Sequence, residues 1–386
     1  MSHTSSRRVS LAFLSLAFLI LLLQQTTTRA QSEAVLPERG QKVERELAGG
    51  AAHSYAVALD AKQFLHVAVE QRGIDIVARL FAPDGKQVVE VDSPNGAHGV
   101  EPVMFVAEAA GAYRLEVRSP EQGAEAGRYE LRTEELRAAT PRDASRVAAR
   151  ALYLQGWLLL GEGKPEALRA AVAKFEESLP LWRDSGDRRG EVDTLNKLAQ
   201  AHEDLKEQTK AVEIYERAIV IAREIGDRQG EAILLNNIGN LYSAAPANKE
   251  KALGYFTRAL AIFRESGDRR REAYVLNNIG EVYIFLPADE QPKAFDYYLQ
   301  ALPLMRSVGD RYGEQHILHN LGVLYAHFNE SQKAIEYLTQ RLPLVRALGD
   351  RESEAATLNY IGGAYLTLGD NQRALAFHTQ ALPIGR

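Results

Sequence analysis

The stretch that decides the fold is GDRQGEAILLNNIGNLY, residues 226–242, because its first three residues return four more times along the chain. The triplet Gly-Asp-Arg begins at intervals of 40, 41, 42 and 40 residues, at Gly186, Gly226, Gly267, Gly309 and Gly349. A fixed period of this length is typical of a stack of similar units and not of one globular core.

Each unit is predicted to be a helical hairpin. In the second unit, apolar residues recur at helical spacing in two separate halves, Ile233, Leu234, Ile238, Leu241 and Tyr242, then Ala252, Leu253, Phe256, Ala259, Leu260 and Phe263. Such spacing places them on one face of each helix. Residues 243–248 between the halves, Ser-Ala-Ala-Pro-Ala-Asn, have the composition of a turn.

The triplet is predicted to join one hairpin to the next. Gly can adopt the left-handed conformation that ends a helix, and Asp can accept hydrogen bonds from the free N–H groups of the following helix. A Glu stands five residues after each Gly, where its negative charge favours the helix dipole, at Glu191, Glu231, Glu272, Glu314 and Glu354. These are structural roles, so we assign the triplet no chemistry.

The order of small and aromatic residues within a unit resembles the tetratricopeptide repeat (TPR). The second unit shows it as Ile238-Gly239, Tyr242, Ala252, Phe256 and Ala259, and the other units follow it over about residues 144–386. The resemblance implies a right-handed α-solenoid of about six hairpins, the last one incomplete. The period exceeds the usual TPR length of about 34 residues. One unit has Arg341 at the position of Ala259, which predicts looser packing there.

Residues 1–30 have the pattern of a secretory signal peptide. Arg7-Arg8 precedes the apolar run Leu11 to Leu23, and Thr28-Arg29-Ala30 offers a small-x-small cleavage site. An uncleaved N-terminal anchor is the alternative. We therefore expect an exported protein, periplasmic or extracellular, with no stable membrane span after signal cleavage.

Residues 38–135 are predicted to form an antiparallel β-sandwich. Seven short β-runs lie between residues 53 and 131, separated by turn residues such as Pro83-Asp84-Gly85. The order of Gly, Asp and Tyr resembles the bacterial pre-peptidase C-terminal (PPC) domain, some members of which bind calcium or polysaccharide. Asp75, Asp84 and Asp92 could supply calcium ligands, but turn roles explain two of them equally well. Residues 136–143 are read as a linker, with Asp143 capping a helix that begins at Ala144.

The composition excludes several classes of function. There is no cysteine, so disulfides and thiol chemistry are absent, and no phosphate-binding loop, nucleophile elbow or HExxH motif is found. Signal cleavage would change the formal net charge from −5 to −8, because Lys+Arg falls from 46 to 43 against 51 acidic residues. We expect no attraction to nucleic acid, no enzymatic activity and no cofactor.

One position of the first helix stands out as a candidate partner-binding site. Two residues before the Leu or Ile of each Leu-Gly pair, the sequence reads Asn196, Asn236, Asn277, His319 and Asn359. We call these five residues the Asn column. An amide offers a donor and an acceptor and suits an extended peptide backbone, as similar TPRs imply. Alternatively, these amides bond to neighbouring repeats and hold the stack together. Both interpretations stay open.

Three histidines, His316, His319 and His327, invite a zinc interpretation, but they do not share one face and no carboxylate completes the set. We predict polar groove histidines and no metal. The expected function is a scaffold that binds a protein or peptide in a concave groove. The chain ends in mid-helix by its own register, and its layout resembles the front of bacterial proteins with a caspase-like (CHAT) domain. The alternatives are the regulatory front of such a peptidase and a secreted sugar- or calcium-binding protein.

Overall fold

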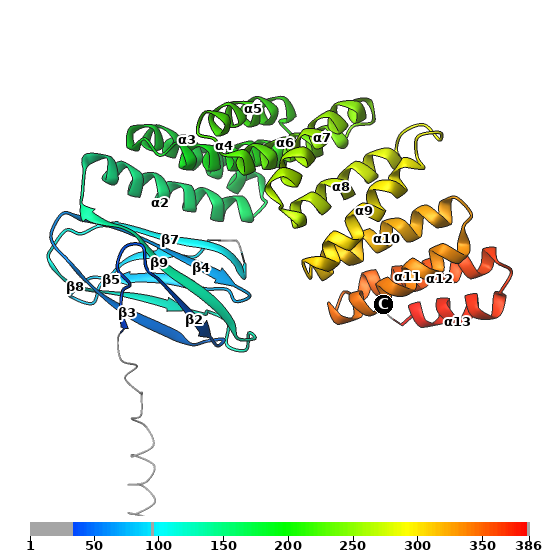
Figure 1. The fold of residues 1–386 in the computed structure, drawn as a ribbon, viewed down its shortest axis with the longest axis horizontal. Helices are drawn as coiled ribbons and strands as arrows, with labels where there is room; N and C mark the ends of the chain where they lie inside the picture. The colour runs from blue at the N-terminus through cyan, green and yellow to red at the C-terminus, as the bar shows by residue number, and fades with distance from the viewer. Residues whose placement is uncertain (1–33, 94–95, 384–386) are drawn as a thin grey trace, which may run out of the picture. The chain divides into compact units, whose positions relative to one another are not determined.

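The computed structural model describes residues 34–93 and 96–383, and the described chain divides into two compact units (Figure 1). The first unit ends at Val147 and the second begins at Ala148. The expected signal peptide, residues 1–30, lies outside the described residues. Within the described chain, no helix is both long enough and apolar enough to cross a bilayer.

The first unit is a β-sandwich, as predicted. One sheet has the order β1-β3-β8-β5-β6, formed by Ala34–Val35, Ala52–Leu59, Gly111–Arg118, Val77–Phe81 and Gln87–Val91. The other has the order β2-β9-β4-β7, formed by Lys42–Leu47, Gly127–Ala138, Gln63–Arg72 and His98–Val106. Alternate residues such as Val67, Leu115 and Leu131 are fully buried and form the core. β1 pairs with β3 in parallel, and the other pairs are antiparallel.

The end of the sandwich differs from the expected linker at residues 136–143. β9 continues to Ala138, because Leu136 and Arg137 pair with Leu65 and Phe64 of β4. Helix α2 (Pro141–Gly161) starts only three residues later. Asp143 therefore lies inside the first turn and does not precede it.

Local contacts explain this early helix start. The Asp143 carboxylate accepts two hydrogen bonds from Arg137, at 2.7 and 2.8 Å, and one from the Thr140 backbone N–H at 2.6 Å. A first-turn carboxylate that accepts the backbone N–H of the residue before the helix is one half of a capping box. The Arg137 guanidinium holds the pKa of Asp143 far below its usual range.

The second unit is a row of helical hairpins, and Figure 1 shows the helices following one another in pairs. After α2, the first helix of each pair is α4 (Arg188–Asp204), α6 (Arg228–Ser243), α8 (Arg269–Ile284), α10 (Arg311–His327) or α12 (Arg351–Thr367). The second helices are α3 (Pro165–Ser185), α5 (Gln208–Glu224), α7 (Lys249–Ser266), α9 (Lys293–Ser307), α11 (Ser331–Ala347) and α13 (Asn371–Ala381), with a short 3-10 helix, η1, at Pro246–Asn248.

The predicted junction chemistry is confirmed. Gly226 has φ 70° and its counterparts lie between 67° and 75°, so all five adopt the left-handed conformation. The Asp227 carboxylate accepts a hydrogen bond from the Gly230 N–H at 2.9 Å, and the other four triplets repeat this cap. The triplet therefore ends one helix and begins the next.

A recurrent ion pair, which the sequence analysis missed, closes each junction. The Glu of the new first turn accepts a hydrogen bond from an Arg three residues before the Gly, at 2.7–2.9 Å, in the pairs Arg183–Glu191, Arg223–Glu231, Arg264–Glu272, Arg306–Glu314 and Arg346–Glu354. Glu191 and Glu231 also bind a second cation, Arg188 and Arg228 respectively. The Glu thus links two hairpins in addition to its favourable place on the helix dipole.

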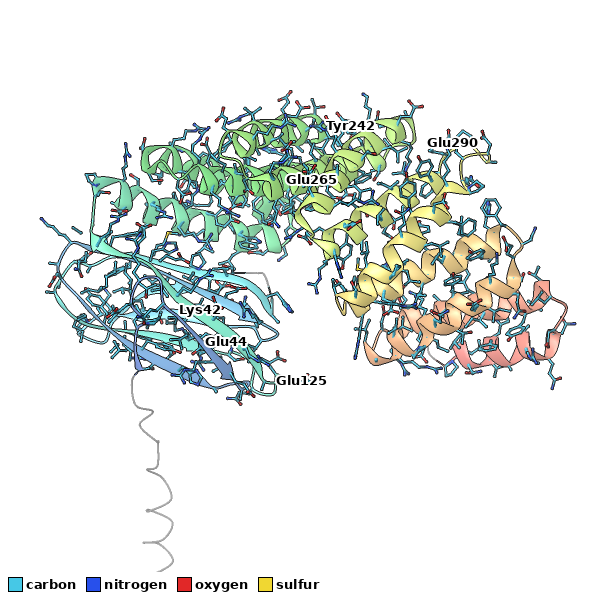
Figure 2. All side chains as sticks on the ribbon, in the orientation of Figure 1. Lys42, Glu44, Glu125, Tyr242, Glu265 and Glu290 are labelled. Atoms are coloured by element: carbon cyan, nitrogen blue, oxygen red, sulfur yellow. The ribbon has the colours of Figure 1, made fainter. Side chains whose placement is uncertain are left out.

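Within each hairpin, small residues permit close helix packing. A Cβ added to Gly239 of α6 would lie 2.6 Å from the Phe256 ring of α7, closer than real side chains approach. Near the turn, Tyr242 stacks on Tyr255 with ring centroids 5.7 Å apart, and three later hairpins repeat the stack. Figure 2 shows Tyr242 on this edge, where Glu290 also marks the longer α8–α9 turn. The differences in repeat length arise in these turns, which are longest between α6 and α7 and between α8 and α9.

Candidate functional site

The candidate site is the side of α4, α6, α8, α10 and α12 that carries the Asn column, which we call the first-helix face. Adjacent first helices contact one another, so this face runs across five hairpins. Asn277 is 9 % exposed, Asn196, Asn236 and His319 are half-buried, and Asn359 is exposed. The members of the Asn column thus lie on five successive first helices and range from nearly buried to exposed.

Hydrogen bonds between hairpins engage the first three members of the Asn column. Asn237 of α6 donates to the Asn196 side-chain oxygen of α4 at 3.0 Å. One hairpin later, Asn278 donates to Asn236 at 3.1 Å. Asn320 then donates to Asn277 at 2.9 Å. In each case the donor stands one residue after the column position in the next hairpin. These three amide oxygens hold neighbouring repeats together, as the second interpretation expected.

The pattern breaks at the fourth and fifth members. The residue one position after Asn359 is Tyr360, whose ring packs edge-on against the His319 ring with centroids 5.5 Å apart. His319 Nδ1 is buried and has no hydrogen-bond partner among the described residues. Asn359 instead shares a 3.0 Å hydrogen bond with His378 of α13. Among the described residues, His319 therefore forms no side-chain hydrogen bond to the next hairpin like those of the three Asn residues before it.

Arg341 of α11 occupies this same region. It is only 4 % exposed and lies where other hairpins have a fully buried Ala, such as Ala259. Its Nε donates to Gln315 of α10 at 2.9 Å and its Nη1 to Thr357 of α12 at 2.6 Å. The guanidinium thus bridges three helices, which accounts for its accommodation at a position where looser packing was expected.

Burial and neighbouring positive charges change the pKa of His319. Desolvation is the largest cause, followed by the positive charge of Arg341 and then His316, and together they lower the pKa of His319 to about 4. His319 is consequently neutral near pH 7. Burial likewise lowers the pKa of Arg341, although an arginine stays charged at any physiological pH.

Three tyrosines on the first-helix face were not singled out from the sequence. Tyr274 of α8, Tyr312 of α10 and Tyr360 of α12 are 38 %, 57 % and 42 % exposed. Aromatic side chains at this exposure are frequent anchors of protein interfaces. A signal existed for Tyr312 and Tyr360, which align with the polar Gln229 and Asn237 of the second unit, whereas Tyr274 aligns with Ile233 of its apolar stripe.

The described residues give no support to a metal site. No group of three or more described His, Asp and Glu side chains is arranged to hold a metal ion. Asp84, one of the calcium candidates, accepts a hydrogen bond from the Lys86 N–H at 2.9 Å, as a turn residue does. His316 packs on Tyr312 with ring centroids 4.8 Å apart, and His327 packs on Phe328.

Taken together, the repeated hairpins, the capped junctions and the packed Gly define a helical-repeat solenoid that follows a β-sandwich in the sequence. The tetratricopeptide repeat family model matches residues 194–265, 271–347 and 316–386. The helical unit of this chain is therefore built from tetratricopeptide repeats. No curated protein matches the sequence.

Solved structures with the same helical fold support this assignment. BtubC (BKLC) from P. vanneervenii superposes with a TM-score of 0.51 at 21 % identity, covering 58 % of this chain and 90 % of that one. The STAND protein PH0952 from Pyrococcus horikoshii, with a tetratricopeptide repeat sensor, gives 0.52 at 20 %, covering 63 % and 38 %. The apo form of RapI gives 0.54 at 17 %, covering 64 % and 66 %. At these identities the likeness concerns the fold alone.

Proposed function

We propose that this chain is an exported scaffold that binds an extended segment of a protein partner along the first-helix face. The observation that carries the proposal is the set of half-exposed tyrosines, Tyr274, Tyr312 and Tyr360, on three successive first helices. A tyrosine buries a large area on binding, loses little rotamer freedom and offers a hydroxyl. They stand on three successive first helices, at different positions of the repeat, and this arrangement suits a ligand that crosses several repeats. The Tyr274 hydroxyl already donates to Asp310 at 3.1 Å, so Tyr274 would contribute mainly its ring.

The Asn column has a different part in this proposal. Because the oxygens of Asn196, Asn236 and Asn277 accept bonds from the next hairpin, they set the spacing of the repeats under the ligand. Any direct contact with a peptide backbone would use their remaining amide hydrogens. Substituting Asn236 and Asn277 together would thus change the stack as well as the surface.

A synthetic peptide array, incubated with the full chain, tests the proposal. We expect a subset of extended peptides to bind, and Tyr274→Ala with Tyr312→Ala to weaken their binding about tenfold, as loss of an aromatic anchor does. Leu299→Ala is the matched control, since Leu299 is 42 % exposed on the second helix α9. Equal binding by the tyrosine variant and the control, or no bound peptide at all, would refute the proposal.

The export part rests on residues 1–30 and is tested separately. Sequencing the N-terminus of the chain recovered from a bacterial periplasm or culture medium should show that it starts after Ala30. Retention of the whole chain in the cytosol would contradict export and leave the peptide-binding proposal intact.

A further inference from the structure

Two departures from the repeat pattern fall in one place. His319 is the one member of the Asn column that is not Asn. Arg341 stands where four other hairpins have a buried Ala, at Ala218, Ala259, Ala301 and Ala381, and where the first has the buried Ser178. The two residues lie 22 positions apart in the sequence, yet the charge of Arg341 acts on His319. Both departures from the repeat pattern therefore lie at α10 and α12, which sets this part of the first-helix face apart from the rest.

Arg341 differs from the other arginines at the hairpin contacts because its partners are neutral. Its hydrogen bonds go to the Gln315 amide, the Thr357 hydroxyl and, at 3.4 Å, the Ser353 carbonyl. No described carboxylate forms an ion pair with it. By contrast, all five junction arginines, such as Arg306, pair with a Glu. Nη2 of Arg341 makes no hydrogen bond to a described residue.

The acidic side chain whose charge acts on Arg341 already has another hydrogen-bond partner. Asp350 interacts electrostatically with Arg341, but its carboxylate caps α12 by accepting the Ser353 N–H at 2.9 Å. A buried guanidinium that lacks a bonded counter-ion projects its field farther than a solvated one, because the surroundings screen it less. The surface above it is therefore favourable for an anion.

That surface carries suitable hydrogen-bond donors. Tyr312 and Tyr360 are about half exposed, and His316 is exposed beside Tyr312. Phenol hydroxyls and an imidazole N–H donate to oxygen. One positive charge without a bonded counter-ion, beside these donors, matches a ligand of one negative charge, whereas a phosphate carries nearly two.

We propose that the first-helix face at α10 and α12 is a subsite for the carboxylate of an Asp or Glu side chain in the bound peptide. The proposal rests on the proposed peptide-binding function and specifies its sequence preference. Arg341 supplies the attraction from beneath the surface, and His316, Tyr312 and Tyr360 make the contacts. The segment at α4 and α6 lacks an equivalent, because buried Ala218 and Ala259 occupy the corresponding positions.

The subsite can be tested without knowing the partner. N-acetylglutamate α-methylamide, whose only charge is the side-chain carboxylate, is titrated into the full chain at pH 7 while the imidazole resonances of His316 and His319 are followed by NMR. We expect a saturable shift, none with the neutral glutamine derivative, and about tenfold weaker binding by Arg341→Ala, since hydrogen bonds and charge pairs of this kind have that effect.

Two further variants keep the test decisive. Lys333→Ala removes the same charge from the first turn of the same helix, where Lys333 lies over the Tyr325 ring at 5.0 Å, and it should bind like the wild type. Arg341→Met keeps the volume if the Ala variant fails to fold. Equal responses to the glutamate and glutamine derivatives, or unchanged binding by both Arg341 variants, would overturn the subsite. A peptide array that yields ligands without an acidic preference would overturn it too, while leaving the proposed function standing.

Discussion

The helical unit contains two regions that use the same repeat differently. From α4 to α8, each Asn-column oxygen is bonded to the following hairpin, and the first two junction glutamates bind two arginines each. At α10 and α12, Tyr360 stands where the amide donor would be and packs edge-on against the His319 ring, and the side-chain hydrogen bonds of Arg341 go to neutral groups. The difference teaches that a repeat can keep its fold while one region bonds its amides across the hairpins and another holds a buried guanidinium without a bonded counter-ion.

The junction ion pairs should show the largest difference between the regions. Arg346→Ala leaves the Glu354 carboxylate without its cation, and the side chain of Glu354 is 10 % exposed. An unpaired, nearly buried charge destabilises, so we expect a loss of about 2 kcal/mol. Arg223→Ala should lose about half as much, because Glu231 keeps Arg228 at 2.7 Å.

Urea denaturation, followed by the helical circular dichroism signal, measures both losses. Arg217→Ala, a surface arginine of α5 for which no ion pair with a described residue is found, provides the control. Equal losses for Arg346→Ala and Arg223→Ala would mean that the second cation at Glu231 contributes nothing.

The two regions should also differ in how their stability depends on pH, because the column position in the second region is His319. Its pKa is lowered from 6.5 to about 4, so between these values the unfolded chain binds a proton that the folded chain does not. The free energy of unfolding therefore falls as the pH drops from 6.5 toward 4 and is unaffected above 6.5. We expect a contribution on the order of 2 kcal/mol, reduced by its partial exposure.

Thermal unfolding of the wild type and of His319→Asn between pH 4 and 7 isolates this contribution. Asn is the residue of the other column positions, so the substitution keeps the repeat pattern. The difference in Tm between the two proteins should change across this window and stay constant above it. A constant difference throughout would show that His319 titrates normally.

The sequence predicted the repeat well because each element of it is local. A Gly that ends a helix and an Asp that caps the next act within four residues, so Gly226 and Asp227 could be interpreted without knowing the fold. Strand β2 (Lys42–Leu47) was missed because most of its residues are charged and exposed, and its pairing with β9 joins distant parts of the chain. Leu136 looked like part of a linker for the same reason.

The site was only half predictable. The Asn column could be located, since one position recurs in every unit. Whether an amide such as Asn236 faces a partner or the next hairpin depends on the register between helices 42 residues apart, as its bond from Asn278 shows. The contacts of Arg341 with Gln315 and Thr357 likewise appear only when three helices come together.

A single amide bond of the first region should have a moderate effect. Asn237→Ala leaves the half-buried Asn196 oxygen without its donor, and we expect a loss of about 1 kcal/mol. Asn359→Ala removes an exposed side chain of the second region and should change stability by less than about 0.5 kcal/mol. Urea denaturation measures both, and a larger loss for Asn359→Ala would reverse the proposed contrast.

The smallest effect on stability is expected for a double substitution that gives the second region the polar residues of the first. In His319→Asn with Tyr360→Asn, the new amides occupy the positions of Asn196 and Asn237, so an inter-hairpin bond worth about 1 kcal/mol becomes possible. The edge-on contact between the His319 and Tyr360 rings is lost, and such contacts contribute about as much. The free energy of unfolding should therefore stay within about 0.5 kcal/mol, whereas binding of N-acetylglutamate α-methylamide should weaken, because a donor is removed. Stability and binding that fell together would indicate that the aromatic contact holds the hairpins in place and is not available to a partner.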